Sequence, residues 1–166
     1  MVPVMPPLRP VAVIDLDGVV CDARHRQRFI TPPRRQWDAF FAAAGDDLPL
    51  PEGVALALAL RHDHDLVWLT GRPERIRELT EGWLRRHGLP TRPLLMRSDT
   101  DRRPARTLKR EVLRKLATER RIALVLDDDP NVVRELQGDG LPVRQATWAG
   151  HTVATPGEAQ QGEDAS

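Results

Sequence analysis

Two apolar stretches of this sequence end in paired carboxylates that could share a divalent cation. Asp15 and Asp17 close the stretch that begins at residue 11, and Asp127 and Asp128 follow residues 122–126. Carboxylates this close repel one another and lose hydration when half buried, so a cation between them is expected. Oxygen ligands of this kind suit Mg²⁺. The sequence therefore predicts a magnesium site formed by these four residues, although an ordinary Asp-Gly turn explains Asp17 equally well.

A hydroxyl, a glycine and an arginine come directly after a further apolar stretch, residues 65–69. They read Thr70-Gly71-Arg72. Where a parallel strand meets the start of a helix, backbone N–H groups and the helix dipole point at one place, which suits a phosphate. A simple turn with Thr70 as the helix cap is the alternative. Since that alternative leaves Arg72 unexplained, the three residues are candidate phosphate ligands.

Lysine is rare in this chain, where nearly all basic residues are arginine. It occurs only at Lys109 and Lys115, and Lys109 falls in the first turn of an expected helix. The ammonium group of lysine is more compact than the guanidinium group of arginine. Its use at this position, in a chain that otherwise uses arginine, favours a specific role for Lys109. Residues 22–35 are, in contrast, rich in arginine. That segment is either a basic flap over the carboxylates or a solvated charged loop.

The elements that must position these residues alternate between strands and helices. We expect one strand to end at the first carboxylate pair, and others at residues 65–69, 93–97, 122–126 and 142–147. Helices are expected with buried faces at Trp37, Phe40 and Phe41, after Pro51, at Ile76, Leu79 and Trp83, at Leu108, Val112 and Leu116, and between Pro130 and Gly138. The pattern predicts an α/β fold in which the candidate residues meet at one sheet edge.

Length, charge and cysteine content restrict the class of protein. The 166 residues fit one domain, and 25 basic against 24 acidic residues give a net charge of +1, so no global field attracts nucleic acid. The single cysteine excludes an intrachain disulfide and suits a reducing compartment. No apolar run is long enough for a bilayer. We expect a cytoplasmic protein without membrane contact, with an extension at residues 1–10, one domain at 11–150 and a loose tail at 151–166.

Four short motifs, in order along the chain, resemble those of the haloacid dehalogenase (HAD) superfamily of phosphotransferases: Asp15-Leu16-Asp17-Gly18, Thr70-Gly71-Arg72, Lys109, and Asp127-Asp128. The resemblance implies a three-layer Rossmann-like fold around a central parallel sheet. It also implies a Mg²⁺-dependent phosphomonoesterase in which Asp15 forms an aspartyl-phosphate and Asp17 is the acid and base. Thr70, Gly71 and Lys109 would hold the phosphoryl oxygens. The spacing of the motifs leaves no room for a large cap domain.

A closer resemblance covers roughly residues 11–145. It rests on residues 70–74, Thr80, Trp83-Leu84, His87, Met96-Arg97, Asp101, Arg103, Lys109 and Asp127-Asp128. These look like the phosphatase domain of polynucleotide kinase-phosphatases, which remove a 3′-phosphate from nucleic-acid ends. The resemblance implies that Arg26 (or Arg24) and Arg72 contact the substrate, that Asp128 binds metal, and that a kinase or ligase encoded separately is a partner. Ala105 departs from the family, which often has aspartate four residues before the lysine.

Two other functions fit the same residues. A phosphatase of small metabolites or nucleotides would share every catalytic residue and differ in what covers the site, so a cap-like segment over residues 24–47 would favour it. A weakly active module that binds phosphorylated ends is conceivable because of Ala105. The intact residues Asp15, Asp17, Lys109 and Asp128 argue against that module.

Overall fold

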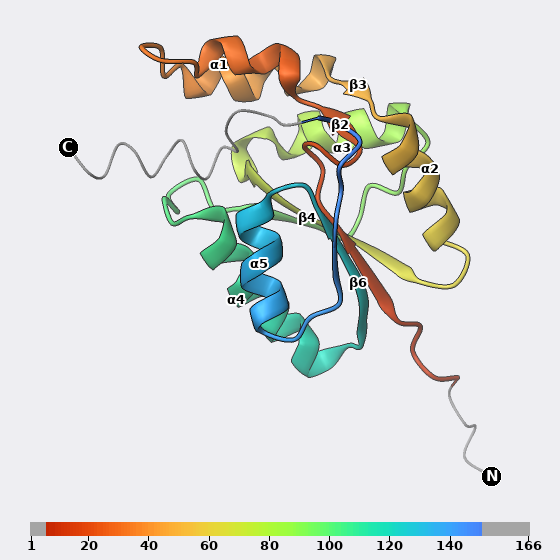
Figure 1. Ribbon diagram of the computed structural model, residues 1–166. Coiled ribbons are helices and arrows are strands. Elements are labelled where there is room, and N and C mark those ends of the chain that lie inside the picture. The colour runs from red at the N-terminus through yellow and green to blue at the C-terminus, as the bar shows by residue number, and fades with distance from the viewer. Residues whose placement is uncertain (1–5, 151–166) are drawn as a thin grey trace.

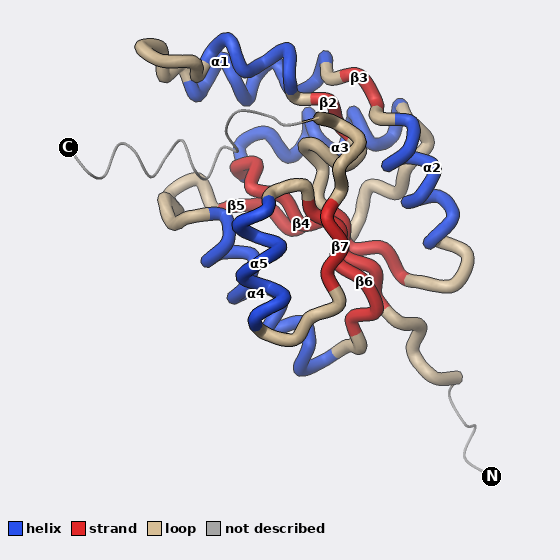
Figure 2. Tube along the Cα trace, in the orientation of Figure 1, coloured by secondary structure: helices blue, strands red, loops and turns tan. Residues whose placement is uncertain are grey.

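The computed structural model of the protein describes residues 6–150, and the expected tail at 151–166 lies outside that range. Five parallel strands form its central sheet, in the order β5-β4-β1-β6-β7. They are β1 (Val11–Ile14), β4 (Asp65–Pro73), β5 (Leu94–Arg97), β6 (Ile122–Asp127) and β7 (Val143–Gln145). The chain builds outward from the central strand β1 in both directions, so the sheet has a switch point beside β1. Figure 2 shows β5 and β4 toward one side of the sheet and β6 and β7 toward the other.

The strand register brings the candidate residues of different strands to one edge. Ile14, the last residue of β1, pairs with Trp68 of β4 and with Leu126 of β6. The amide of Asp15 then donates to the carbonyl oxygen of Leu126 at 3.0 Å. Asp15 and Asp127 therefore leave neighbouring strands at the same level.

Helices cover both faces of the sheet, which gives the expected three layers (Figure 1). One face packs against α2 (Pro51–Leu60) and α3 (Arg77–Arg86), and the other packs against α4 (Ala105–Glu119) and α5 (Pro130–Gly138). All four residues of β1 are buried: Ala12 and Ile14 face the first pair of helices, and Val11 and Val13 face the second. A strand covered on both sides explains the uninterrupted apolar run in the sequence.

Two helices present faces other than the expected ones. In α3 the buried residues are Thr80, Trp83 and Leu84, while Ile76 lies in a preceding 3₁₀ turn, η3 (Glu74–Ile76). In α4 the buried line is Ala105, Lys109 and Leu113, and the expected stripe of Leu108, Val112 and Leu116 is only half buried beside it. The line includes a lysine because its ammonium is paired with carboxylates at the sheet edge, which periodicity of apolar residues alone cannot anticipate.

The junction after β4 also differs from the expectation. The strand continues to Pro73, and η3 separates it from α3. Thr70 therefore lies inside a strand and caps no helix, so the expected helix start at Thr70-Gly71-Arg72 is wrong. A phosphate bound here would therefore contact the end of β4 and its side chains. It would not lie at the N-terminus of α3, because that helix begins several residues later.

A small segment between β1 and α2 lies over the carboxyl edge of the sheet, where Figure 1 shows α1 above the strands. Its elements are β2 (Cys21–Asp22), η1 (Arg24–Phe29), α1 (Trp37–Ala42), η2 (Ala43–Asp46) and β3 (Leu48–Pro49). The expected aromatic face is buried, since Phe40 and Phe41 are covered and pack with Trp37 and Ile30. No large cap domain occurs within residues 6–150, as expected, and no helix in that range is long and apolar enough to cross a membrane.

Candidate active site

Lys109 joins two carboxylates at the centre of the sheet edge. Its Nζ lies 3.1 Å from Asp15 Oδ2 and 2.6 Å from Asp127 Oδ2, and all three residues are buried. The other oxygen of each carboxylate accepts a backbone N–H, from Leu16 at 2.7 Å and from Asp129 at 3.0 Å. Both carboxylates are thus held at each oxygen, and Lys109 is central to the site even though it lies in the second turn of α4 rather than the first.

This buried cluster carries more negative than positive charge, because its carboxylates outnumber the one ammonium group. Burial raises the pKa of Asp15 to about 7, against the opposing charge of Lys109. Burial, followed by the charge of Asp15, raises the pKa of Asp128 well above its usual range. Burial alone would lower the pKa of Lys109, but the charges of Asp127 and Asp15 raise it. The ammonium stays charged and balances only part of the carboxylate charge.

The cluster suits a divalent cation. Carboxylate oxygens of Asp15, Asp127 and Asp128 lie within 4.8 Å of one another. Among the described residues, none donates a hydrogen bond to the carboxylate of Asp128, whose backbone carbonyl accepts from Gln145. A carboxylate in that state is costly unless something positive approaches it. Three carboxylate ligands are the donor set that Mg²⁺ takes, so the residues present fit that ion.

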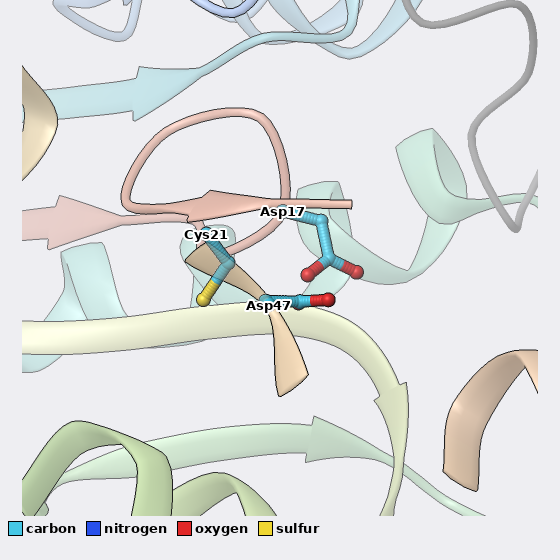
Figure 3. Close-up of side chains that lie close together, drawn as sticks. All are labelled: Asp17, Cys21 and Asp47. Carbon is cyan, nitrogen blue, oxygen red and sulfur yellow. The ribbon is translucent and has the colours of Figure 1, made fainter. Parts of the chain in front are cut away.

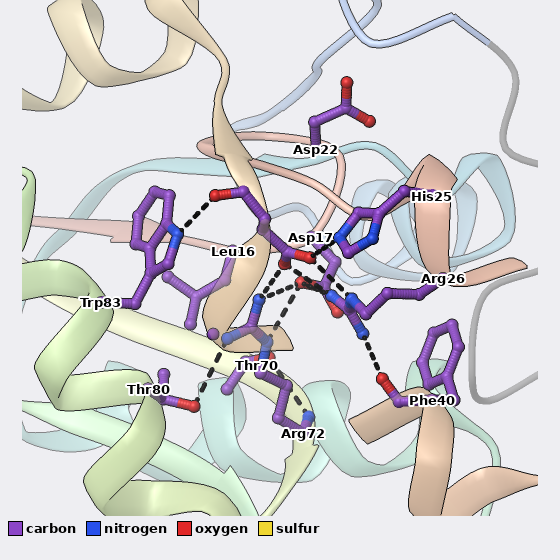
Figure 4. A network of polar contacts seen from close by, with 12 residues as sticks. Leu16, Asp17, Asp22, His25, Arg26, Phe40, Thr70, Arg72, Thr80 and Trp83 are labelled. Atoms are coloured by element: carbon purple, nitrogen blue, oxygen red, sulfur yellow. Dashed lines mark hydrogen bonds and ion pairs between the residues drawn. The ribbon is translucent and has the colours of Figure 1, made fainter. Parts of the chain in front are cut away.

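Asp17 faces a different set of partners, the guanidinium groups of Arg26 and Arg72 (Figure 4). Its Oδ1 accepts from Arg72 Nη2 at 2.5 Å, from Arg72 Nε at 3.0 Å and from Arg26 Nη2 at 3.0 Å. Burial works against ionisation of Asp17, but Arg72 and then Arg26 outweigh it and lower the pKa to about 2. Asp17 is therefore a carboxylate at neutral pH.

A second buried carboxylate, Asp47, holds the same two arginines from the other side. Its Oδ1 and Oδ2 accept from Arg26 Nε and Nη2, each at 2.7 Å, and Oδ2 also accepts from Arg72 Nη2 at 2.9 Å. The Asp47 carbonyl accepts from the indole of Trp83 at 2.8 Å. Figure 3 shows Asp47 beside Asp17 and Cys21. The two arginines and two aspartates form a closed ionic square that fixes where Asp17 points.

The sulfur of Cys21 lies close enough to this square to resemble a metal ligand. Burial raises the pKa of its thiol, so the sulfur stays protonated, and the two guanidinium groups already neutralise the carboxylates. Cys21 therefore packs as a small apolar residue.

The predicted site residues thus separate into two groups. Asp15, Asp127 and Asp128 converge with Lys109, whereas Asp17 belongs to the arginine square and its side chain lies outside that ligand set. Arg26 and Arg72 are at most 1% exposed, and both form ion pairs with carboxylates, so neither is part of an exposed basic flap. Arg24 is exposed and pairs with Asp22.

Thr70 and Gly71 lie beside the cluster, where the strand β4 passes it. Thr70 is buried, and its Oγ1 accepts the amide of Arg72 at 3.2 Å. Together with Lys109, these two residues line a cavity of about 200 Å³. Two of the three candidate phosphate ligands therefore share a cavity with Lys109, whereas Arg72 does not line it.

Asp47 is a residue of the candidate site that the sequence did not predict. It lies in an ordinary polar stretch, Asp46-Asp47, without an apolar strand before it. The sequence offered only an indirect signal. If Arg26 and Arg72 both pair with Asp17, one positive charge is left without a carboxylate partner.

Solved structures of known proteins resemble this fold. Two chains from "Structure of the Pnkp1/Rnl/Hen1 RNA repair complex" and "Structure of Pnkp1/Rnl/Hen1 complex" match at TM-scores of 0.69 and 0.70, with 24% and 25% identity over 83% and 84% of this chain. The chain spans less than half of those chains, 42% and 45%. The class C acid phosphatase of Bacillus anthracis matches at a TM-score of 0.58, with 15% identity over 96% of this chain and 80% of that one.

The family of the chain follows from its sequence rather than from its fold. No curated protein is similar enough to count as a match. The family described as "Polynucleotide kinase PNKP phosphatase domain" matches residues 10–148, which include every candidate residue discussed above. The chain belongs to this family of HAD phosphatases, close to the phosphatase domain of polynucleotide kinase-phosphatases.

Proposed function

We propose that this phosphatase is a Mg²⁺-dependent phosphomonoesterase that acts through an aspartyl-phosphate, on 3′-phosphate ends of nucleic acid. The observation that carries the proposal is the position of Asp15, whose Oδ2 lies beside the ammonium of Lys109 in a cluster that fits a divalent cation. A carboxylate oxygen placed beside fixed positive charge can attack a phosphorus atom whose oxygens need that same charge.

In the first step, an Asp15 oxygen forms a bond to phosphorus while the ester P–O bond breaks. The leaving alkoxide takes a proton from Asp17, and in the second step Asp17 removes a proton from the water that hydrolyses the aspartyl-phosphate. Asp17 is ionised in the substrate-free protein, which suits the second step. A dianionic phosphate placed next to it would raise its pKa and favour the protonated form that the first step needs.

Other residues of the chain hold the phosphoryl group and its charge. Thr70, Gly71 and Lys109 line the cavity beside Asp15, and they would donate hydrogen bonds to the phosphoryl oxygens. Asp15, Asp127 and Asp128 would hold Mg²⁺. When bound, the ion neutralises charge between the phosphate and the attacking carboxylate. Arg26, Arg72 and Asp47 orient Asp17, and this replaces the direct substrate contacts that we expected of the two arginines.

The choice of substrate is supported by the family and by the two RNA-repair structures that the fold resembles. A kinase or ligase as a partner is part of the same proposal, because both of those structures are of complexes. One observation favours the alternative of a small-metabolite phosphatase, namely the small helical segment of residues 24–47 that lies over the edge of the sheet.

The deciding experiment compares three substrates at one ionic strength: a 3′-phosphorylated oligonucleotide, its 5′-phosphorylated twin and a 3′-mononucleotide. We expect the first to have the highest kcat/KM and to lose it steeply as salt rises, since binding neighbouring phosphates releases counterions. Turnover of a small generic ester should respond weakly. Equal rates on all three substrates, or preference for the mononucleotide, would favour the small-metabolite phosphatase instead.

A further inference from the structure

Three arginines are almost completely buried near the candidate active site, and only two of them are paired with carboxylates. Arg26 and Arg72 each contact both Asp17 and Asp47. Arg97, at the carboxyl end of β5, is 5% exposed and forms no ion pair with any described residue. The charge of Asp101 acts on Arg97 through space, without an ion pair, so burial of this guanidinium remains costly.

The hydrogen bonds of Arg97 go to neutral carbonyl groups. Nε donates to Gly71 O at 3.1 Å, and Nη1 donates to the carbonyls of Asp101 at 3.2 Å and Arg103 at 2.6 Å. Nη2 is buried and has no hydrogen-bond partner among the described residues. Buried donors of this type are rarely left unsatisfied in native proteins, so an unused Nη2 calls for an explanation.

The position of Nη2 suggests one. Arg97 lines the cavity of about 200 Å³ that Thr70, Gly71 and Lys109 share. A Cβ atom built on Gly71 would lie 3.8 Å from Arg97 Nη2, so this donor reaches the strand segment that borders the phosphate site. The unpartnered donor therefore belongs to a residue that shares a cavity with Thr70, Gly71 and Lys109, and does not lie in a remote part of the core.

We propose that the Arg97 side of this cavity is a second anion subsite, in which Arg97 Nη2 binds the phosphodiester next to the terminal phosphate that Thr70, Gly71 and Lys109 hold. The inference rests on the proposed function and goes further, because it names the residue that distinguishes a polynucleotide end from a mononucleotide. Guanidinium groups bind phosphate oxygens through charge-assisted hydrogen bonds. Because Nη2 is already shielded from water, an anion that reaches it does not have to remove a hydration shell from the donor.

The test uses substrates that differ only in the charge of that one linkage. A 3′-phosphorylated dinucleotide with an ordinary phosphodiester is compared with the same molecule carrying an uncharged methylphosphonate linkage. For the unaltered protein we expect kcat/KM to favour the charged linkage by about tenfold, the magnitude of one hydrogen bond to a charged group. Equal kcat/KM for the two dinucleotides overturns the subsite.

Two variants tie the preference to Arg97. Arg97→Lys keeps a charge but removes Nη2, and it should lower the ratio of the two kcat/KM values. Arg97→Gln also removes the charge and should bring that ratio close to one. Because the ratio compares two substrates of the same variant, it stays valid if either substitution disturbs the carbonyl contacts.

The control is matched to Arg97→Gln. Arg121→Gln removes one positive charge from an exposed residue just before β6, at the opposite end of the sheet, and should retain the ratio. If Arg97→Lys slows both dinucleotides equally, Arg97 binds the terminal phosphate and the proposal is wrong. If the unaltered protein hydrolyses none of the phosphomonoesters with Mg²⁺, it is the proposed function that fails.

Discussion

Gly18 lies directly against Asp128: a Cβ atom on Gly18 would lie 2.0 Å from Asp128 Oδ2. Gly18 also has a φ of +78°, a conformation that only glycine adopts without strain. The glycine of the first motif is therefore required twice, once by the turn out of β1 and once by the carboxylate that comes after β6. This contact links two motifs that are more than a hundred residues apart.

Gly18→Ala should consequently weaken Mg²⁺ binding and lower the stability of the protein. The control is Gly88→Ala, because Gly88 has a φ of +70° but nothing within 4 Å of a Cβ atom. That control should lose about 1 kcal/mol of unfolding free energy, the cost of the left-handed conformation alone. Urea denaturation and Mg²⁺ titration measure both effects. If the two variants lose equal stability and both bind Mg²⁺ normally, the contact with Asp128 is irrelevant.

Replacement of the two carboxylates of the first motif should have opposite effects on folding. Asp15→Asn should reduce activity to background, since the attacking charge is gone, while folding is retained or improved. Asp17→Asn should lower the free energy of unfolding by about 3 kcal/mol, because it leaves two buried guanidinium groups with one carboxylate. Turnover with a generic phosphomonoester and chemical denaturation test this pair. Retention by Asp15→Asn of more than roughly a tenth of the rate, a loss below 1.4 kcal/mol, would falsify covalent catalysis by Asp15.

The stability of the metal-free protein should depend on pH in the way that these two carboxyl groups require. The pKa of Asp15 is raised to about 7, so the folded state holds that proton more tightly, and this contribution to stability is lost as pH rises toward 7. The pKa of Asp17 is lowered to about 2, so its contribution is present above the ordinary range and is lost as pH falls toward 2. Denaturation in EDTA across this range should show the rise in stability of Asp15→Asn relative to the unaltered protein as pH increases. A constant difference would contradict the assignment.

Activity should require Mg²⁺ and disappear with a chelator, because three carboxylates converge on one point with a single ammonium. Ca²⁺ should inhibit, since its longer and looser coordination misplaces the phosphate relative to Asp15. Asp128→Asn should raise the Mg²⁺ concentration needed for half-maximal rate. Undiminished turnover in excess EDTA is the result that the proposal does not survive.

Asp47→Asn should lower kcat and destabilise the protein by about 3 kcal/mol, because Arg26 and Arg72 lose a buried counter-charge. Asp46→Asn, at the exposed neighbouring position, is the matched control and should change neither quantity. Since Asp47 acts through Asp17, the pH profile of kcat should shift as well. A variant that folds less well but keeps the pH profile would reduce Asp47 to a structural role.

The sequence by itself determined the sheet and the composition of the catalytic cluster. Apolar runs that end in carboxylates predict parallel strands, and the carboxyl ends of parallel strands share one edge, so Asp15 and Asp127 had to approach one another. The place of Lys109 beside them was expected from the resemblance to the HAD motifs. Rules of this kind are local, because they depend only on the residues at the end of a strand or at the start of a helix. The absence of a large cap was predictable in the same way, from the short spacing between motifs.

Only the tertiary structure decided which charges neutralise which. Asp17 turns away from the other carboxylates because the segment of residues 22–50 folds over the edge and brings Asp47 and Arg26 to it, beside Arg72 of β4. Arg97 Nη2 remains without a hydrogen-bond partner among the described residues because its strand ends among carbonyl groups. Such pairings join residues separated by 9 to 55 positions and have no periodicity, so the energy of burying each charge becomes calculable only when the fold has placed its partners.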